Sequence, residues 1–501
     1  MLAIACDTLR SLLCLPATRL IEMVARGECS SEDLVRAHLD RIQAVNPSLN
    51  AVVEVRANGA LAEAKAQDEA AARGVPRGPL GGLPITIKSS IEVEGLRCEA
   101  GSPTRAGIVA HRDAVVVSRL RAAGAIVLGT TNVAEMLMAY SSENPLYGRT
   151  NNPWAVDRTP GGSSGGEAAA IAAGCSAGGI GSDAGGSVRV PAHFSGICAL
   201  KPTPGRIPST GHRPACLGPF ALIGVVGPMA RTVDDLDAMF RVIAGDDRVD
   251  PAGAPVSIVP YEPHKLASDG SHRVEGLTIG YFESDGRVPV TLETRQAVRA
   301  AVDALSASGC RVEPATIDGL DRAREIWGVF FAEIGRLLLS EALHGAETEL
   351  PILKAYAEER GGRSRDRVPV DASTADSVGV SLSTADFVHA WIERDEIRAK
   401  VLRQMESHRV LICPVAAIPA FRHGERSWNI DGQSVSYLDA MSYTQWFNIL
   451  GNPAVVVPVG RSPEGLPIGV QVVGRPYEEE LVIAVARAVE QGCGGYRHPP
   501  I

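Results

Sequence analysis

The stretch 160–191 constrains the fold of this chain more than any other segment. It reads PGGSSGGEAAAIAAGCSAGGIGSDAGGSVRVP and contains two glycine-rich turns, one around Ser163 and one before Ser187. Glycine is favoured where the backbone must adopt a positive φ or approach another group closely. A flexible Gly/Ser linker is the alternative interpretation, but a linker would be polar throughout. Because the Ala-rich helix former 167–173 and the apolar Ile180 lie between the turns, we predict a buried, shaped pair of loops around the two hydroxyls.

This stretch resembles the sequence signature of the amidase signature family of serine hydrolases. Residues 161–166 read GGSSGG, and residues 181–191 match every position of G-[ST]-D-x-G-G-S-[IV]-R-x-P. The resemblance covers most of residues 20–490, as one fold. Similar segments outside the signature lie at 44–51, 130–136, 147–154, 200–206, 446–454 and 469–474. The chain departs from the family at Ser89-Ser90, where many members carry Asp-Asn.

The resemblance implies a Ser-Ser-Lys catalytic triad and a covalent acyl-enzyme. Ser187 corresponds to the nucleophile, Ser163 to a bridging serine after a cis peptide bond, and Lys88 to the terminal base. The proton of Ser187 would pass through Ser163 to Lys88 and return to the leaving amine. The resemblance further implies an oxyanion hole formed by the backbone N–H groups of Ala184, Gly185, Gly186 and Ser187, and structural support from Ser164, Asp183 and Arg189.

Lys88 also stands out from the residues alone. It ends the apolar run 83–88, where a surface lysine would gain nothing. Burial favours the neutral amine, which lowers the pKa of a lysine and makes it a usable base. Histidine is the usual base for a serine nucleophile, but none of the 11 histidines lies in a stretch that otherwise looks catalytic. His193, the nearest to Ser187 in sequence, is better explained as a structural histidine.

Short apolar runs alternate with helical patterns and predict βαβ units with a largely parallel sheet. We expect an α/β fold in which residues 76–495 form one large domain, with a mixed, mostly parallel twisted sheet covered by helices on both faces. Residues 1–75 are expected as an N-terminal helical region packed on this core, with one helix ending at Asn46-Pro47, and a variable loop region is expected near 357–384. Predicted strands lie at 83–88, 125–129, 279–282, 311–314, 410–414, 453–458 and 469–474, and predicted helices at 114–123, 293–308 and 478–491.

Composition excludes several classes of partner. The net charge of −9 is spread over interspersed acids and bases without a long basic run, which argues against nucleic acid or an anionic membrane as the main partner. No stretch approaches the roughly 20 apolar residues of a membrane span. Ten cysteines are scattered singly without a C-x-x-C pair, so we expect no metal site and a reduced, cytoplasmic protein. We also expect no cofactor.

The residues that we expect to line a substrate pocket are apolar. Met136, Leu137 and Met138 precede the first glycine turn, and Trp446 lies in one of the similar C-terminal segments. Methionine and aromatic clusters are more often core than pocket, but together these residues favour an apolar acyl or aryl site. Further candidates for the pocket wall are Tyr140, Leu217, Phe220, Leu222, Trp327, Phe330 and Phe331.

We therefore expect an amidase that hydrolyses the C–N bond of small, neutral, hydrophobic carboxamides or anilides. Segments 144–148 and 285–290 are similar to the family branch that hydrolyses fatty-acid amides and aryl acylamides. The alternative is the A-type subunit of a glutamine-dependent amidotransferase, which shares the triad and acts in a tRNA-modifying complex. An inactive binding module is disfavoured because all three triad positions are intact. The apolar N-terminal helices are compatible with a homodimer.

Overall fold

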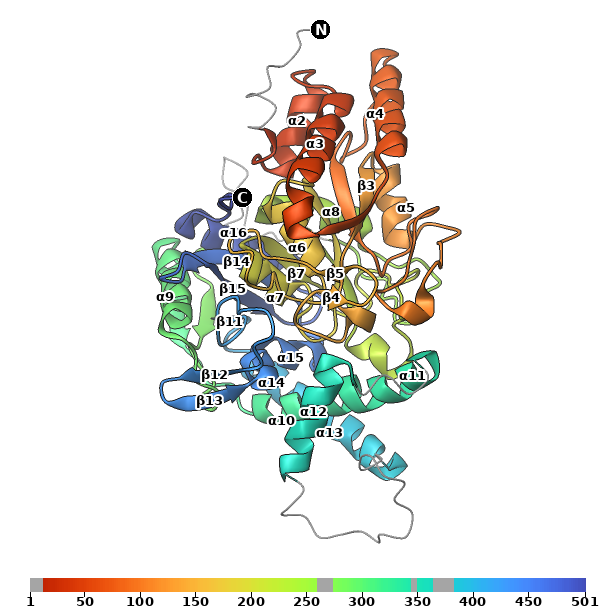
Figure 1. Ribbon diagram of the computed structural model, residues 1–501. Helices are drawn as coiled ribbons and strands as arrows, with labels where there is room; N and C mark the ends of the chain where they lie inside the picture. The colour runs from red at the N-terminus through yellow and green to blue at the C-terminus, as the bar shows by residue number, and fades with distance from the viewer. Residues whose placement is uncertain (1–11, 259–273, 344–348, 364–382) are drawn as a thin grey trace.

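An eleven-stranded sheet runs through the part of the chain that the computed structural model describes, residues 12–258, 274–343, 349–363 and 383–501 (Figure 1). Its strands follow the order β1 (Val52–Val55), β3 (Ile126–Thr131), β2 (Pro84–Lys88), β6 (Gly178–Asp183), β8 (Val225–Ala230), β7 (Cys198–Lys201), β14 (Ala454–Arg461), β15 (Pro467–Gly474), β11 (Val410–Pro414), β9 (Thr278–Tyr281) and β10 (Arg311–Pro314). Two small sheets pair β4 (Glu143–Asn144) with β5 (Gly148–Arg149), and β12 (Ser427–Ile430) with β13 (Gln433–Ser436).

The sheet is mixed because its connections differ in type. In two pairs of parallel neighbours, a helix connects one strand to the next. Helix α5 (Val115–Ala122) connects β2 to β3, and α9 (Leu292–Ala307) connects β9 to β10. Only residues 462–466 join β14 to β15, and such a short connection requires an antiparallel pair. The α/β class and the mixed sheet are confirmed. Parallel pairing links β3–β2–β6 and β11–β9–β10. The edge strand β1 pairs antiparallel with β3, and the strands between the two parallel groups also pair antiparallel.

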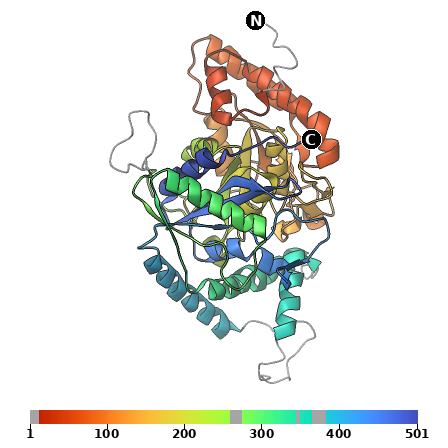
Figure 2. The same ribbon diagram turned by 90° about the vertical axis from the view of Figure 1, so that its left-hand side faces the viewer.

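Helices cover both faces of the sheet. On one face α9 and α16 (Glu479–Cys493) lie side by side (Figure 2), with α5 and α8 (Val233–Ile243) on the same side. The opposite face carries α7 (Arg189–Ser195), α10 (Leu320–Gly328) and α15 (Ser442–Ile449). Strand β14 shows the division, because Val455 and Val457 pack on the first side and Ala454 and Val456 on the second. The remaining helices are α2 (Ala17–Ala25), α3 (Ser31–Leu49), α4 (Ala57–Ala72), α6 (Gly165–Ala172), α11 (Ile334–Leu343), α12 (Pro351–Arg363), α13 (Thr384–Gln404) and α14 (Tyr437–Ala440).

The N-terminal region differs from the expectation in two details. Helix α3 runs through Pro47 to Leu49 instead of ending at Asn46-Pro47. A proline this close to the end of a helix removes little intrahelical bonding, and Asn46 Oδ1 accepts the N–H groups of Ala51 and Val52 at 2.8 and 2.9 Å. The region also supplies β1 to the sheet, so it is not purely helical.

Parts of two predicted regions lie outside the described residues. These parts are residues 1–11 of the N-terminal region and residues 364–382 of the variable loop region. Within the latter, α12 continues to Arg363 and α13 begins at Thr384. In the described part of the chain, every helix is too short or too polar to cross a membrane.

Three adjacent strands end at the same edge of the sheet. Lys88 is the last residue of β2, Thr131 of β3 and Asp183 of β6, and Lys88 pairs with Thr131 in the parallel ladder. Because β2 is parallel to both neighbours, the three carboxyl ends lie together. Helix α6 starts directly after Ser163 and Ser164 and packs on these strands. The fold thus brings the segment of Ser163 to the end of the strand that carries Lys88.

Candidate active site

Lys88 is fully buried, and oxygen atoms of two serines surround its amine. Its Nζ lies 2.7 Å from Ser163 Oγ, 2.9 Å from Ser182 Oγ and 3.4 Å from the Ser182 carbonyl oxygen. Ser182 belongs to β6, the strand beside β2, and Ser163 belongs to the turn before α6. The Gly162–Ser163 peptide is cis, as the resemblance implies. These contacts fix the amine against the Ser163 hydroxyl.

Burial lowers the pKa of the Lys88 amine to about 7, because a dry environment disfavours the charged form. The negative charge of Asp183 is the main influence in the opposite direction. An amine with this pKa is substantially neutral at physiological pH. It can therefore accept a proton, which an ordinary surface lysine cannot do.

Ser187 lies in the turn between β6 and α7, and both Ser187 and Ser163 line the same cavity. The two glycine-rich turns are joined directly, since the N–H of Ser164 donates to the carbonyl oxygen of Ser187 at 3.2 Å. Among the described residues no hydrogen bond links the hydroxyls of Ser187 and Ser163. Such contacts are often long in the absence of substrate.

The carbonyl groups at positions 184 and 185 are held by side chains of the core. Trp327 Nε1 donates to the Ala184 carbonyl oxygen at 2.8 Å. The hydroxyls of Tyr140 and Thr444 donate to the Gly185 carbonyl oxygen at 3.0 and 2.7 Å. Because the C=O and N–H of a trans peptide point in opposite directions, these bonds also orient the N–H groups of this turn.

The four N–H groups expected to form the oxyanion hole are not equivalent. Within the described part of the chain, the N–H groups of Ala184, Gly185 and Ser187 have no hydrogen-bond acceptor. The N–H of Gly186 instead donates to Asp183 Oδ1 at 2.8 Å, so in this structure it is not a free donor. Gly186 has a φ of +123°, and a Cβ on Gly185 would lie 2.6 Å from Trp327 Cζ2, so both positions require glycine.

Asp183 and Arg189 form a completely buried ion pair that organises the second turn. Arg189 Nη2 lies 3.0 Å from Asp183 Oδ1, and Asp183 Oδ2 accepts the N–H of Val188 at 3.1 Å. Burial alone would raise the pKa of Asp183, but the Arg189 guanidinium holds it well below the usual range. Arg189 also reaches Gln471 Oε1 at 3.2 Å. Ser164, the third residue expected to give support, donates from its hydroxyl to the Ser182 carbonyl oxygen at 3.2 Å.

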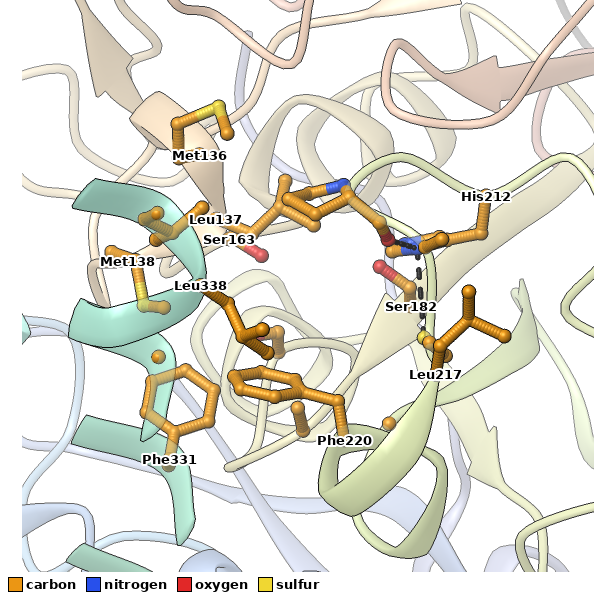
Figure 3. Close-up of a pocket in the computed structure, with 18 of the residues that line it drawn as sticks. Met136, Leu137, Met138, Ser163, Ser182, His212, Leu217, Phe220, Phe331 and Leu338 are labelled. Atoms are coloured by element: carbon orange, nitrogen blue, oxygen red, sulfur yellow. Dashed lines mark hydrogen bonds between the residues drawn. The ribbon is translucent and has the colours of Figure 1, made fainter. Parts of the chain in front are cut away.

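A largely apolar cavity of about 380 Å³ lies beside the two serines. In Figure 3, Phe331 and Leu338 approach it from one side, and Leu217 and Phe220 from the other. Three of the four predicted pocket residues, Met136, Leu137 and Met138, line it.

Trp446, the fourth predicted pocket residue, does not line the cavity. It is buried in the core, with ring centroids 4.9 Å from Tyr443, 6.4 Å from Phe282 and 6.1 Å from Phe447. Trp327 supports the wall from behind, because it stacks on the cavity-lining Phe331 at 4.8 Å. Trp446 is therefore held by its neighbours in the core and does not contact the cavity.

The polar wall of the cavity contains residues that we did not predict. Ser182 binds the Lys88 amine, and only its position beside Asp183 at the end of a strand could have indicated this. His212 and Cys216 come from a distant loop and carried no signal in the sequence. His212 Nδ1 lies 2.7 Å from the Pro214 carbonyl oxygen, and burial lowers the pKa of its ring to about 4, so the ring is neutral.

Glu167 lies beside the two strands that end at Lys88 and Thr131. Its carboxylate accepts hydrogen bonds from Thr86 and Thr131, and its charge interacts with Lys88. It is the only charged residue of α6, whose other residues are small or apolar, and this pattern indicates that the carboxyl group is buried. In the segments that the structure describes, no group of three or more His, Cys, Asp and Glu side chains is arranged to hold a metal ion.

Comparison with known proteins places this geometry in context. Residues 33–483 match the Amidase family model. The chain is 34% identical over 505 residues to the A-type subunit of the Glutamyl-tRNA(Gln) amidotransferase of Synechococcus sp. (strain CC9605), covering 96% of each protein. It is 33% identical over 513 residues to Fatty-acid amide hydrolase 2-A of Danio rerio, covering 97% of this chain and 90% of that protein. A solved structure of 6-aminohexanoate cyclic dimer hydrolase complexed with substrate aligns with a TM-score of 0.79 at 28% identity, covering 97% of this chain and 99% of that one.

Proposed function

The chain belongs to the amidase signature family, whose members cleave amide C–N bonds, and we propose that it hydrolyses neutral, hydrophobic carboxamides or anilides without a partner protein. One observation carries the proposal. The buried amine of Lys88 lies 2.7 Å from Ser163 Oγ at the wall of an apolar cavity that Ser187 also lines. A serine hydroxyl needs a base to remove its proton, and this contact supplies one without a histidine.

In the acylation half of the reaction, Ser187 Oγ attacks the carbonyl carbon of the substrate. Its proton moves to Ser163 Oγ while the Ser163 proton moves to the neutral amine of Lys88. The free N–H groups of Ala184, Gly185 and Ser187 stabilise the oxyanion of the tetrahedral intermediate. The C–N bond then breaks, the leaving nitrogen takes a proton back through Ser163, and an ester on Ser187 remains.

In the deacylation half, water attacks this ester. The proton of the water passes along the same relay to Lys88 as the second tetrahedral intermediate forms. Ser187 Oγ then leaves with a proton returned by Ser163, and the carboxylic acid is released. Every proton that Lys88 accepts is given back within one turnover, so no cofactor is consumed.

The lining of the cavity supports an apolar substrate. Methionine, leucine and phenylalanine side chains form most of its wall, and burial of apolar area there is worth roughly 25 cal/mol per Å². Among the described residues that line it, there is no lysine or arginine. Asp183, its one carboxylate, is already paired with Arg189. A charged substrate would lose its hydration without finding a partner.

The relatives favour a second candidate function. Seven of the similar proteins are A-type subunits of Glutamyl-tRNA(Gln) amidotransferases, at 31% to 35% identity. On that reading the chain would release ammonia from glutamine within a complex. Glutamine carries both an ammonium and a carboxylate group, however, and the apolar lining offers no evident anchor for either. This observation is why hydrolysis of apolar amides is preferred.

Release of 4-nitroaniline from N-acyl 4-nitroanilides of increasing acyl length tests the proposal. The purified chain should turn over these substrates alone, with kcat/KM rising until the acyl group fills the cavity. Ser187→Ala should lower kcat about 10⁴-fold or more, as expected when a nucleophile is removed. Ser306→Ala, which alters an exposed serine whose hydroxyl donates to the Val302 carbonyl oxygen, is the matched control and should keep full activity.

Glutamine is assayed in parallel to separate the two candidates. One outcome would contradict the first candidate and support the second: the folded protein hydrolyses none of the anilides but releases ammonia from glutamine, alone or with added partner proteins. Equal rates across the acyl series would contradict the apolar site while leaving the serine mechanism in place.

A further inference from the structure

A buried carboxyl group that the mechanism above does not use lies next to the strands of Lys88. Glu167 of α6 is fully buried, Thr131 Oγ1 donates to its Oε2 at 2.7 Å, and Thr86 Oγ1 donates to its Oε1. Thr86 precedes Lys88 by two residues in β2 and therefore shares its face of the sheet. Thr131 pairs with Lys88 across β2 and β3. The carboxyl group is thus attached to the strand pair that ends in the base.

The sheet leaves room for this carboxyl group. Gly179 of β6 pairs with Thr86 in the parallel ladder, and a Cβ on Gly179 would overlap both Glu167 Oε1 and the Thr86 carbonyl oxygen. Any other residue at position 179 would therefore displace the carboxyl group. Since α6 begins directly after Ser163 and Ser164, Glu167 also ties the helix that follows the bridging serine to the strand of the lysine.

The charge environment of Glu167 differs from that of Asp183. Asp183 has an ion-pair partner, Arg189, at 3.0 Å, whereas in the described residues Glu167 has only hydroxyl partners. Its charge acts on Lys88, and that of Lys88 acts on it. A buried anion without a paired cation is unfavourable, so a positive charge on Lys88 would stabilise it.

Among the other ionisable groups near Lys88, Asp183 has the largest influence on its pKa. His212 and Cys216, from the loop that packs on the end of β2, carry a neutral ring and a thiol whose pKa burial raises to about 12. Asp183 stays charged throughout because its pKa is held well below the usual range. Burial raises the pKa of Glu167 to about 7, so its charge changes in the same range as that of Lys88.

We propose that Glu167 is a positioning residue, held by Thr86 and Thr131, whose charge adds to that of Asp183 in raising the proton affinity of Lys88 and stabilises the ammonium group formed during acylation. The inference rests on the proposed function, because it assigns Lys88 the role of base. When the proton of Ser187 reaches Lys88, an ammonium group is created inside the protein. The neighbouring carboxylate offsets this charge.

The test measures how fast a fluorophosphonate probe labels Ser187 as a function of pH. Such a probe reacts with an activated serine and needs no amide substrate. In Glu167→Gln the acidic limb of the profile should move to lower pH by about one unit, because loss of a nearby anion lowers the pKa of a lysine. The plateau rate should fall about threefold, since a weaker base removes the proton less efficiently. Glu167→Asp keeps the charge and should restore the position of the limb.

Glu490→Gln is the matched control. Glu490 is also a carboxyl group whose pKa burial raises to about 7, but it accepts the N–H of Val233 at 3.1 Å and does not act on Lys88. The acidic limb of the pH profile of Glu490→Gln should coincide with that of the wild type. An unshifted limb in Glu167→Gln, or an equal shift in Glu490→Gln, would overturn the inference.

A second variant covers the case in which Glu167→Gln does not fold. Thr131→Val removes one hydrogen bond to the carboxylate, which favours the protonated form of Glu167, and should move the limb in the same direction. No movement in that variant would also overturn the inference. Absence of labelling in the folded wild type would instead contradict the proposed function, because Ser187 would then not be activated.

Discussion

At the scale of single residues, the site depends on a lysine whose side chain is fully buried. Unfolding would return Lys88 to its ordinary pKa of 10.5, whereas burial lowers the pKa to about 7 in the folded protein. Between these values the unfolded chain binds more protons, so Lys88 opposes folding, increasingly as the pH falls from 10.5 to about 7. The role proposed for this residue thus comes at the expense of stability.

Replacing Lys88 by methionine should therefore abolish activity and raise the melting temperature. The rise should be larger at pH 7 than at pH 10. At pH 7 the cost of burying Lys88 is nearly at its maximum, because the unfolded chain is fully protonated there and the folded protein is not. Thermal unfolding at the two pH values measures it. Lys65→Met, at an exposed position of α4, should change the melting temperature equally at both. A lower melting temperature for the Lys88 variant at both pH values would contradict the argument.

The same pKa predicts how activity depends on pH. The neutral amine of Lys88 is the form that accepts a proton, so kcat/KM should rise with pH up to about 7 and level off above it. Below pH 6 the rate should fall about tenfold per pH unit. A profile measured with a 4-nitroanilide or the fluorophosphonate probe checks this. A flat profile between pH 5 and 8 would argue against Lys88 as the base.

At the scale of elements, the turn between β6 and α7 is held from outside by the core. Trp327 and Thr444, from α10 and α15, bind the carbonyl groups of Ala184 and Gly185. These bonds orient the N–H groups of the same peptides, and because Gly185 and Gly186 have no side chains, the core can approach the backbone there. The rigidity of the turn therefore comes from helices more than 100 residues away in sequence.

Gly185→Ala should disturb this arrangement. Its Cβ would lie 2.6 Å from Trp327 Cζ2, so either the ring or the turn must move and the N–H groups lose their alignment. Loss of an oxyanion donor costs on the order of 10²-fold in kcat. Gly460→Ala is the control, because the nearest atom to its Cβ would be an unstrained 3.5 Å away. Full activity in Gly185→Ala would exclude this turn as the oxyanion hole.

At the scale of the whole molecule, the buried ion pair of Asp183 and Arg189 links distant parts of the sheet. Arg189 also binds Gln471 of β15, and Asn448 Nδ2 of α15 binds Asp183 Oδ1 at 2.9 Å. The pair therefore connects the turn of Ser187 to the C-terminal strands and helices. A homodimer remains a prediction, and sedimentation of the purified protein tests it.

Arg189→Met should lower the free energy of unfolding by about 3–5 kcal/mol, because it leaves the buried carboxylate of Asp183 without its partner. Urea unfolding followed by circular dichroism measures the change. Arg322→Met, which breaks an exposed ion pair with Glu393, should cost only about 0–1 kcal/mol. An equal decrease in the free energy of unfolding of the two variants would show that the buried pair contributes no more to stability than the exposed one.

Local patterns in the sequence determined the fold class and much of the site's composition. The alternation of apolar runs and helical patterns predicted β2, β3, β9, β10, β11, β14 and β15 to within a few residues, because burial and periodicity act over short stretches. The glycine-rich signature indicated where the backbone approaches other groups closely. The apolar run before Lys88 indicated a buried amine. Each of these inferences depends on residues that are neighbours in sequence.

The tertiary structure alone decided which groups meet. Ser182 binds Lys88, and Glu167 binds Thr86 of the same strand, because β6 and α6 pack against β2, and no local pattern encodes that pairing. It also decided that the Gly186 N–H is taken by Asp183 and that Trp446 lies in the core and not at the cavity. The physical reason is the same in each case. Hydrogen bonds and packing depend on distances between segments far apart in the chain, and those distances exist only after the sheet has assembled.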